Sequence, residues 1–235
     1  MRIRLRQVAL VARDLAATEK AIIEALGLEL CYRDPGVATF GLHNALFPIG
    51  DKLLEVISPT EDGTTAGRLL DKRGGDGGYM VIFEIDDLDQ MRRQLDEAGA
   101  RVVFEATIEG ITGLHLHPRD VGGAIVSVDQ VHEWGEWPWA GPDWKQHVRT
   151  DVVRGISHVD IQANDPSAMA TRWSEVLGRP AQNNSIALDE GTIRFVPVAD
   201  DRGEGISAVE LLGAGKAGET REIDICGCRF RIAGA

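Results

Sequence analysis

The chain has 235 residues, of which 43% are apolar and 26% charged, a composition typical of a folded protein. Acidic residues outnumber basic ones by 37 to 25, which gives a formal net charge of −12. Because an acidic surface repels phosphate backbones and Lys and Arg form no compact cluster, nucleic acid is not expected as a partner. No apolar run approaches the roughly 18 residues of a membrane helix, so no membrane association is expected either.

The three cysteines favour a reducing compartment. Their number is odd, and Cys226 and Cys228 are separated by a single residue, which argues against a framework of disulfides. The N-terminus is basic, but no apolar block of the signal-peptide kind follows it. We therefore expect a cytoplasmic protein with structural cysteines.

An internal repeat is the most informative feature of the chain. Three segments share one layout, in which a strand-like run is followed by an amphipathic helical stretch that ends at glycine. They cover residues 7–27, 80–99 and 158–178. The first and third copies align without a gap, so that Asp14 matches Asp165 and Gly27 matches Gly178.

Each copy has the local signals of a strand followed by a helix. Asp14 and Asp165 are suited to cap the helix N-termini, and Pro166 suits the first helical position. Gly27 and Gly178 suit the left-handed residue that follows a helix. The copies therefore predict helices that begin after Asp14 and after Asp165.

Short strand-like runs follow each helix and complete a β-α-β-β-β module. The runs lie at residues 28–33, 37–42 and 52–58 in the first copy and at 101–105, 111–117 and 124–129 in the second. The third copy continues to about residue 198. A fourth copy would start near Ile206, where the remaining residues allow strands at 206–212 and 222–232 but no helix. The predicted fold is therefore α+β, with one full module pair and a shortened second pair.

A Trp-rich segment, residues 131–153, lies between the second and third copies. Tryptophan is costly to expose to water, so this segment is not a flexible linker. It either packs across the junction between the two halves or forms a wall of a ligand pocket, with Trp137 and Trp139 as ligand-binding residues. The predicted domains are thus residues 1–130 and 154–235, joined by this segment.

The repeat resembles the vicinal oxygen chelate superfamily, which includes glyoxalase I, methylmalonyl-CoA epimerase and extradiol dioxygenases. Three stretches carry the resemblance: the opening strand at residues 8–15, the run at residues 54–59, and the hairpin at residues 116–124, which is similar to the epimerase version. The resemblance implies that paired modules form curved mixed sheets around a small-molecule pocket.

In metal-using members of the superfamily, four pocket-facing positions bind a divalent cation. The resemblance places them on Gln7, Glu55, Met80 and Ser127. The family usually has His at the first and third of these positions and Glu at the fourth, and Glu55 at the second suits a metal ligand. One carboxylate with three neutral partners is a poor ligand set for Fe, Mn or Zn. No metal cofactor is therefore expected there. In the third copy, His158 falls on the first ligand position and Phe195 on the second.

A displaced metal site is the alternative. His115 and His117 are two residues apart on a predicted strand and so share a face. Together with Glu55 they could hold iron, manganese or zinc. The competing interpretation is that His117, which precedes Pro118, only anchors a turn.

Three functional hypotheses follow. The first is a metal-free pocket that sequesters a small molecule or acts on it by acid–base chemistry, with Glu55, His115 and His117 as catalytic residues and Gln7, Met80 and Ser127 contacting the ligand. The second is a metal-dependent lyase, isomerase or dioxygenase with the displaced ligand set. The third is a scaffold whose pocket is vestigial. The shortened second half is expected to cover a sheet edge or to mediate homodimer formation.

Overall fold

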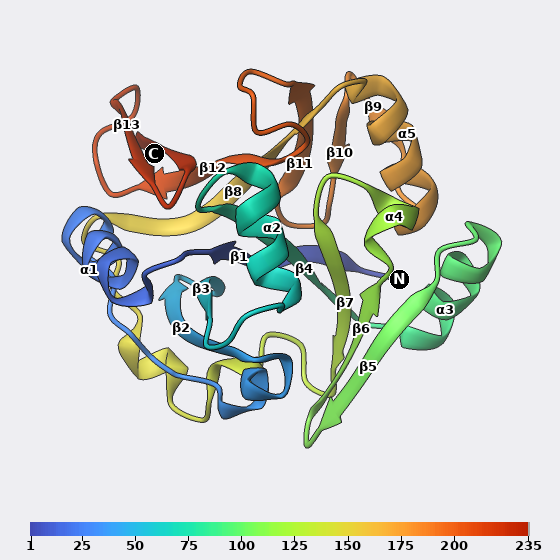
Figure 1. Cartoon of the computed structure of the whole chain (residues 1–235), viewed down its shortest axis with the longest axis horizontal. Helices are drawn as coiled ribbons and strands as arrows, with labels where there is room; N and C mark the ends of the chain where they lie inside the picture. The colour runs from blue at the N-terminus through green and yellow to red at the C-terminus, as the bar shows by residue number, and fades with distance from the viewer. Residues whose placement is uncertain (235) are drawn as a thin grey trace.

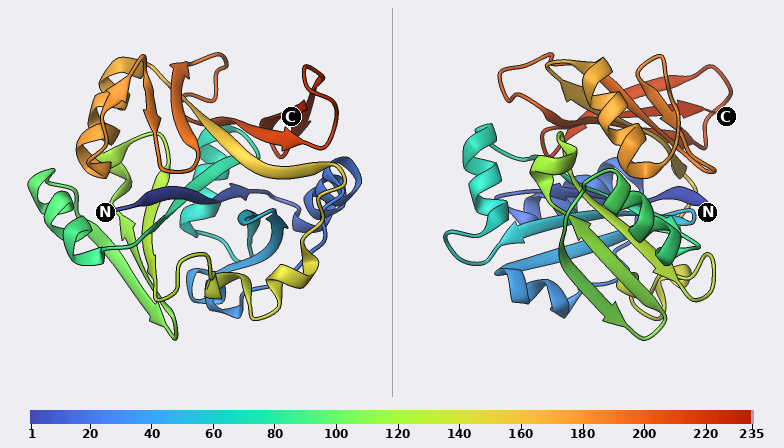
Figure 2. Two further views of the ribbon diagram at one scale, coloured as in Figure 1. Left: turned by 180° about the vertical axis from the view of Figure 1, so that it is seen from behind. Right: turned by 90° about the vertical axis from the view of Figure 1, so that its right-hand side faces the viewer.

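The computed structural model describes residues 1–234, which form two seven-stranded mixed sheets packed face to face (Figures 1 and 2). The first sheet has the strand order β2-β3-β1-β4-β7-β6-β5. Its strands are β1 (Ile3–Val11), β2 (Leu42–Ile49), β3 (Lys52–Pro59), β4 (Gly77–Ile85), β5 (Val102–Ile108), β6 (Ile111–Leu116) and β7 (Ile125–Val131). At its centre β1 pairs parallel with β3 and antiparallel with β4.

The second sheet repeats this plan with the order β13-β14-β12-β8-β11-β10-β9. Its strands are β8 (Val153–Ala163), β9 (Ala181–Gln182), β10 (Ser185–Ala187), β11 (Thr192–Pro197), β12 (Gly205–Gly213), β13 (Thr220–Ile225) and β14 (Cys228–Gly234). No helix lies between residues 205 and 234, so the last module is shortened as predicted. The predicted α+β class with mixed sheets is confirmed.

The helices of the repeat begin and end at the predicted caps. Asp14 and Asp165 accept hydrogen bonds from the backbone three residues on, and Gly27 and Gly178 adopt left-handed conformations. Residues 1–234 contain five α-helices, which are α1 (Leu15–Leu26), α2 (Thr65–Arg73), α3 (Leu88–Glu97), α4 (Pro118–Val121) and α5 (Pro166–Leu177). Three 3-10 helices are η1 (Pro35–Phe40), η2 (Pro138–Ala140) and η3 (Trp144–His147).

The first copy departs from the predicted strand pattern. Residues 28–33 form only an isolated bridge between Tyr32 and Leu46, and residues 37–42 lie mostly in η1 rather than in a strand. Asp34 and Pro35 explain the second error, because the Asp34 side chain caps the turn and Pro35 sits at its first position. Helix α2 was not predicted at all.

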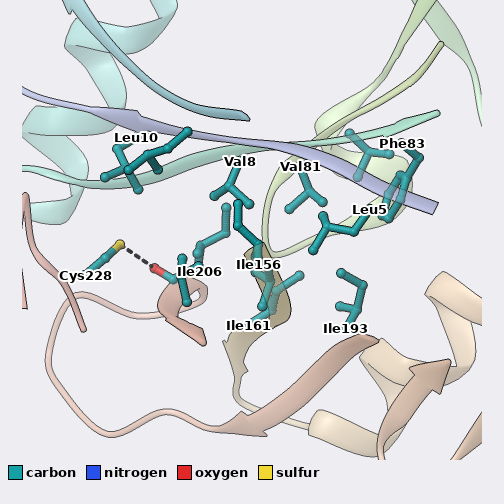
Figure 3. Close-up of a cluster of buried hydrophobic side chains, with 14 of the residues drawn as sticks. Leu5, Val8, Leu10, Val81, Phe83, Ile156, Ile161, Ile193, Ile206 and Cys228 are labelled. Atoms are coloured by element: carbon teal, nitrogen blue, oxygen red, sulfur yellow. Dashed lines mark hydrogen bonds between the residues drawn. The ribbon is translucent and has the colours of Figure 1, made fainter. Parts of the chain in front are cut away.

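Apolar side chains from both sheets form one core between them (Figure 3). Val8 and Leu10 of β1 face Ile161 of β8 and Ile206 of β12 across this layer. Helices α1, α3 and α5 add their buried faces to the same core. We call the side of the first sheet that carries Val8 and Leu10 its core face, and the opposite side its site face.

Two extra residues in the central strands shape the site face. Between Leu5 and Gln7 the pairing with β4 shifts by one, which makes Arg6 an extra residue in β1. Tyr79 is the equivalent extra residue in β4. Such bulges re-aim side chains, and here Arg6 and Gln7 both contact Trp137 on the site face.

The site face is covered at both ends. Helix α2 packs Ala66 and Leu70 on one end of it, against Val11 and Ile57. The Trp-rich segment covers the other end, where Trp137 and Trp144 are almost fully buried. No helix within residues 1–234 has the length and apolar composition needed to cross a membrane.

Candidate functional site

Four neighbouring strands bring the predicted ligand positions onto the site face. In the order β3-β1-β4-β7, Ala9 pairs with Glu55 on one side and Met80 on the other. One step along, Gln7 pairs with Ile82, which pairs with Ser127. Because paired residues share a face, Gln7, Glu55, Met80 and Ser127 form two adjacent rows. All four are buried, with at most 7% of any side chain exposed.

Glu55 is the centre of a hydrogen-bonded network. The Gln7 amide donates to its Oε2 over 2.8 Å, and the Asn44 amide donates to its Oε1 over 2.7 Å. The Gln7 carbonyl oxygen in turn accepts a hydrogen bond from the Trp137 indole over 2.7 Å. Both carboxylate oxygens are therefore fixed in orientation, and Trp137 closes the network from the side of the Trp-rich segment.

Burial dominates the electrostatics of this carboxyl. It raises the pKa of Glu55, and the two amide donors oppose that rise because they stabilise the charged form. Burial also raises the pKa of Tyr79 to about 12, and the Glu55 charge contributes to this increase. The net result is a Glu55 carboxyl whose pKa lies above its usual value because it is buried.

A second buried acid, Asp129, lies two residues beyond Ser127 on the same strand. It accepts hydrogen bonds from the Ser127 hydroxyl and from the Trp139 indole, the latter over 2.8 Å. Burial raises the pKa of Asp129 to about 7. Two indoles of the Trp-rich segment are therefore linked to two buried acids: Trp137 bonds to Glu55 through Gln7, and Trp139 bonds to Asp129 directly.

The two predicted histidines have different surroundings. His115 packs beside Phe104 and Phe40, with ring centroids 5.2 and 6.4 Å away, and burial lowers its pKa to about 4. It is therefore neutral at physiological pH. His117 accepts a hydrogen bond from the Arg119 backbone at the start of α4, the turn-anchoring position considered from the sequence.

The donor set does not fit a divalent metal. At the four family positions the chain offers one carboxylate, an amide, a thioether and a hydroxyl, and the first two are already bonded to each other. Among residues 1–234, no three side chains of His, Cys, Asp or Glu lie close enough together to hold a metal ion. Glu55, His115 and His117 are thus not brought together as the displaced ligand set.

Arginines within β1 and just before it stack against the Trp-rich segment. Arg2 and Arg4 lie over the ring of Trp134, at 4.2 and 4.7 Å from its centroid. The Arg6 guanidinium lies over the rings of Trp137 and Trp144, at 5.1 and 5.3 Å from their centroids. The segment also borders a hollow of about 290 Å³, which is lined by Glu136, Trp137, Pro138, Gly141, Pro142 and Trp144.

Comparison with known proteins identifies the family. The family model described as "Glyoxalase-like domain" matches residues 8–177 of the chain. The chain belongs to this glyoxalase-like family. As the resemblance implied, it is a member of the vicinal oxygen chelate superfamily.

Individual relatives resemble either about half of the chain or all of it. The ethylmalonyl-CoA/methylmalonyl-CoA epimerase of Cereibacter sphaeroides is 28% identical over 132 residues, which are 54% of this chain and 98% of that protein. A Streptomyces coelicolor methylmalonyl-CoA epimerase in complex with 2-nitronate-propionyl-CoA has 22% identity and a TM-score of 0.50, over 55% of this chain and 98% of that one. A hypothetical protein from Staphylococcus aureus matches both chains over their full length, with a TM-score of 0.76 and 13% identity. The last match shows that the whole two-sheet architecture occurs elsewhere.

Sequence reasoning missed several residues of this glyoxalase-like site. Asp129 could have been found, because it lies two residues from Ser127 in a predicted strand and so shares its face. Asn44 gave no such signal, since β2 was placed several residues too early. Arg6 and Tyr79 reach the site face through bulges, which no residue pattern marked.

Proposed function

We propose that the site face of the first sheet binds a small carbonyl compound and moves a proton next to its carbonyl group, with Glu55 as the acid–base group and no divalent metal. The observation that carries this proposal is the network of Gln7, Asn44 and Trp137 around Glu55. Gln7 and Glu55, which this network joins, stand at two of the positions that the resemblance assigns to metal ligands.

The chemistry of Glu55 supports proton transfer. A general base works best when its pKa is near the working pH, and burial shifts the pKa of Glu55 in that direction. The two amide donors orient both oxygens and would support the carboxylate after it releases a proton. His115, neutral and half-buried, is a candidate hydrogen-bonding partner for a ligand at the other end of the face.

The relatives suggest the reaction class. An epimerase must remove a proton from one carbon and return it to the opposite face, and a neighbouring carbonyl makes that proton acidic. The epimerases that resemble this chain match it over about half of its length. We therefore propose a carbonyl compound with an acidic α-proton as the substrate.

Sequestration of a ligand without chemistry is the second candidate. It is favoured by the burial of Trp137, of which only 1% is exposed, because its indole stands between solvent and the Glu55 network. A binding protein would need only to admit its ligand, whereas an enzyme must also release product.

Deuterium exchange tests the proposal. The protein is incubated with methylmalonyl-CoA in D2O, with EDTA or with added Co²⁺, Mn²⁺, Fe²⁺ or Zn²⁺, and α-deuterium is measured by mass spectrometry. We expect exchange that resists EDTA and that falls by about 100-fold or more in Glu55→Gln. Glu24→Gln, which changes an exposed glutamate on α1, is the matched control.

Each alternative outcome has a distinct meaning. Exchange that appears only with added metal would contradict the metal-free proposal. Binding without exchange would support sequestration, and the absence of both binding and exchange would reject a role in methylmalonyl-CoA chemistry.

A further inference from the structure

Tyr79 is a polar side chain on the site face whose hydroxyl has no role in the Glu55 network. It is the extra residue of β4, inserted between Gly78, which pairs with Leu10, and Met80, which pairs with Ala9. Its ring packs against the apolar side chains at both covered ends of the site face. A ring in contact with both groups lies between them, on the middle part of the face.

Glu55 stands at the same level of the sheet, on the other side of β1. Strand β1 separates β3, which carries Glu55, from β4, which carries Tyr79, and Ala9 of β1 pairs with both Glu55 and Met80. Burial raises the pKa of Tyr79, the Glu55 charge raises it further, and the Arg68 charge on α2 lowers it. The phenol is therefore within electrostatic reach of the Glu55 carboxylate and keeps its proton at physiological pH.

The Tyr79 hydroxyl is a free donor beside Glu55. The other side-chain donors around it are already bonded to acids or amides, and they are Gln7, Asn44, Ser127 and Trp137. Within residues 1–234 no hydrogen bond involves the Tyr79 hydroxyl, and this residue is only half-buried. The hydroxyl is not one of the fully buried polar atoms that lack a partner, so solvent reaches it. A ligand that enters from solvent can therefore accept a hydrogen bond from Tyr79 without breaking an existing one.

Removal of an α-proton creates a charge that such a donor can stabilise. When a base takes the proton, the electron pair of the C–H bond moves into the carbonyl group, and negative charge develops on the carbonyl oxygen. Metal-using enzymes place a cation at this oxygen, whereas a site without a metal needs a hydrogen-bond donor there. A neutral phenol with no other partner is a donor of this kind.

We propose that Tyr79 donates a hydrogen bond to the carbonyl oxygen of the substrate and stabilises the enolate that forms when Glu55 removes the α-proton. The proton moves from carbon to the Glu55 carboxylate, and a proton later returns to the carbon, while Tyr79 keeps its own proton throughout. Tyr79 is thus a second catalytic residue, across β1 from the base. This inference rests on the proposed function, because it assigns the group that replaces a metal in the same site.

The kinetics of deuterium exchange test this role. Tyr79→Phe keeps the ring but loses the donor, so kcat for exchange into methylmalonyl-CoA should fall by about 100-fold, while KM should change by less than about threefold. Tyr32→Phe, which changes the only other tyrosine of the chain, is the matched control and should keep kcat. A kcat for Tyr79→Phe within about threefold of the parent value, or an effect confined to KM, would overturn the inference.

A second experiment measures the proximity of the two side chains without a substrate. Both tyrosines are replaced biosynthetically by fluorotyrosine, and the fluorine NMR resonance of Tyr79 is assigned by its absence from Tyr79→Phe. Glu55→Gln removes a negative charge and should lower the pH at which this resonance titrates, whereas Arg68→Gln should raise it. An unchanged titration in Glu55→Gln would place Tyr79 too far from Glu55 to act on the same substrate, and would reject the inference.

The inference and the proposed function can fail separately. Exchange that depends on Glu55 but not on the Tyr79 hydroxyl would reject the role of Tyr79 and leave the proposed function intact. The absence of exchange in the unsubstituted protein would reject both. Exchange that falls in Glu55→Gln and in Tyr79→Phe, but not in Tyr32→Phe, is the expected result.

Discussion

The two sheets have the same strand order, but the polar side chains at equivalent positions are buried on the first sheet and partly exposed on the second. On the site face of the first sheet, Gln7 and Glu55 are buried under the Trp-rich segment. At the equivalent places of the second sheet, His158 pairs with Glu210, and Arg194 pairs with Asp160 and Glu210. Between 23% and 30% of the His158, Arg194 and Glu210 side chains is exposed.

This difference shows that access of water to a sheet face determines which kinds of polar groups can satisfy its acidic side chains. Under the Trp-rich segment, neutral amides and indoles satisfy the acids, because a buried charge is costly unless it is paired. On the second sheet, where water reaches the face, ions of both signs pair with one another at little cost. On the covered face, burial raises the pKa values of both Glu55 and Asp129.

Loss of the Trp137 side chain, which covers the site face of the first sheet, should reduce stability more than any other change considered below. In Trp137→Ala, the loss of a fully buried indole and of the donor to Gln7 should reduce the free energy of unfolding by about 3–5 kcal/mol. Urea unfolding followed by circular dichroism measures this loss. Trp137→Phe, which keeps a ring but loses the donor, should cost less than half as much. Equal losses in both variants would assign the whole effect to the hydrogen bond.

The buried acid Asp129 should make stability depend on pH. Its folded pKa of about 7 lies above its ordinary value of 3.8, so the folded state keeps the proton longer than the unfolded state does. Its contribution to stability is therefore full below about pH 4, declines as pH rises toward 7 and is constant above that.

Asp129→Asn imitates the protonated form and can donate to the Ser127 hydroxyl. It should be about 2–4 kcal/mol more stable than the parent at pH 8 and similar to it at pH 4. Thermal unfolding at a series of pH values measures the difference. A constant difference across this range would show that Asp129 does not titrate there.

Substitutions on the partly exposed face of the second sheet should reduce stability least. Arg194→Gln removes a partly exposed partner of Asp160, but Arg231 still holds that carboxylate over 2.5 Å. We expect a change within about 1 kcal/mol, measured by urea unfolding. If Arg194→Gln lowered the free energy of unfolding as much as Trp137→Ala, the ion pairs of the second sheet would contribute as much to stability as the buried Trp137 does.

The repeat predicted the parts of the fold that depend on local chemistry. Asp14, Asp165, Gly27 and Gly178 cap their helices as expected, because capping is decided within one turn. The four family positions also share one face, as the two-residue period of strands implies. The roles proposed for Glu55, His115 and His117 remain predictions.

The features that depend on contacts between distant parts of the chain could not be predicted reliably from the sequence. Phe195 was placed at the second ligand position of the third copy, but Arg194 is the residue that pairs with Asp160, as Glu55 pairs with Ala9. A slip of one residue puts a side chain on the wrong face of a sheet. The contacts of Trp137 with Arg6 and Gln7 span about 130 positions, and no local pattern could reveal them.

The single apolar layer between the sheets has a consequence for how the molecule folds. Val8, Phe83, Ile161 and Ile206 belong to one core, and Gly78 lies so close to Ile206 that a β-carbon there would be 2.2 Å from it. Neither half can lose its structure without exposing the apolar surface of the other. The chain should therefore melt in one cooperative transition, and a fragment that ends before residue 153 should be unable to form a stable fold by itself.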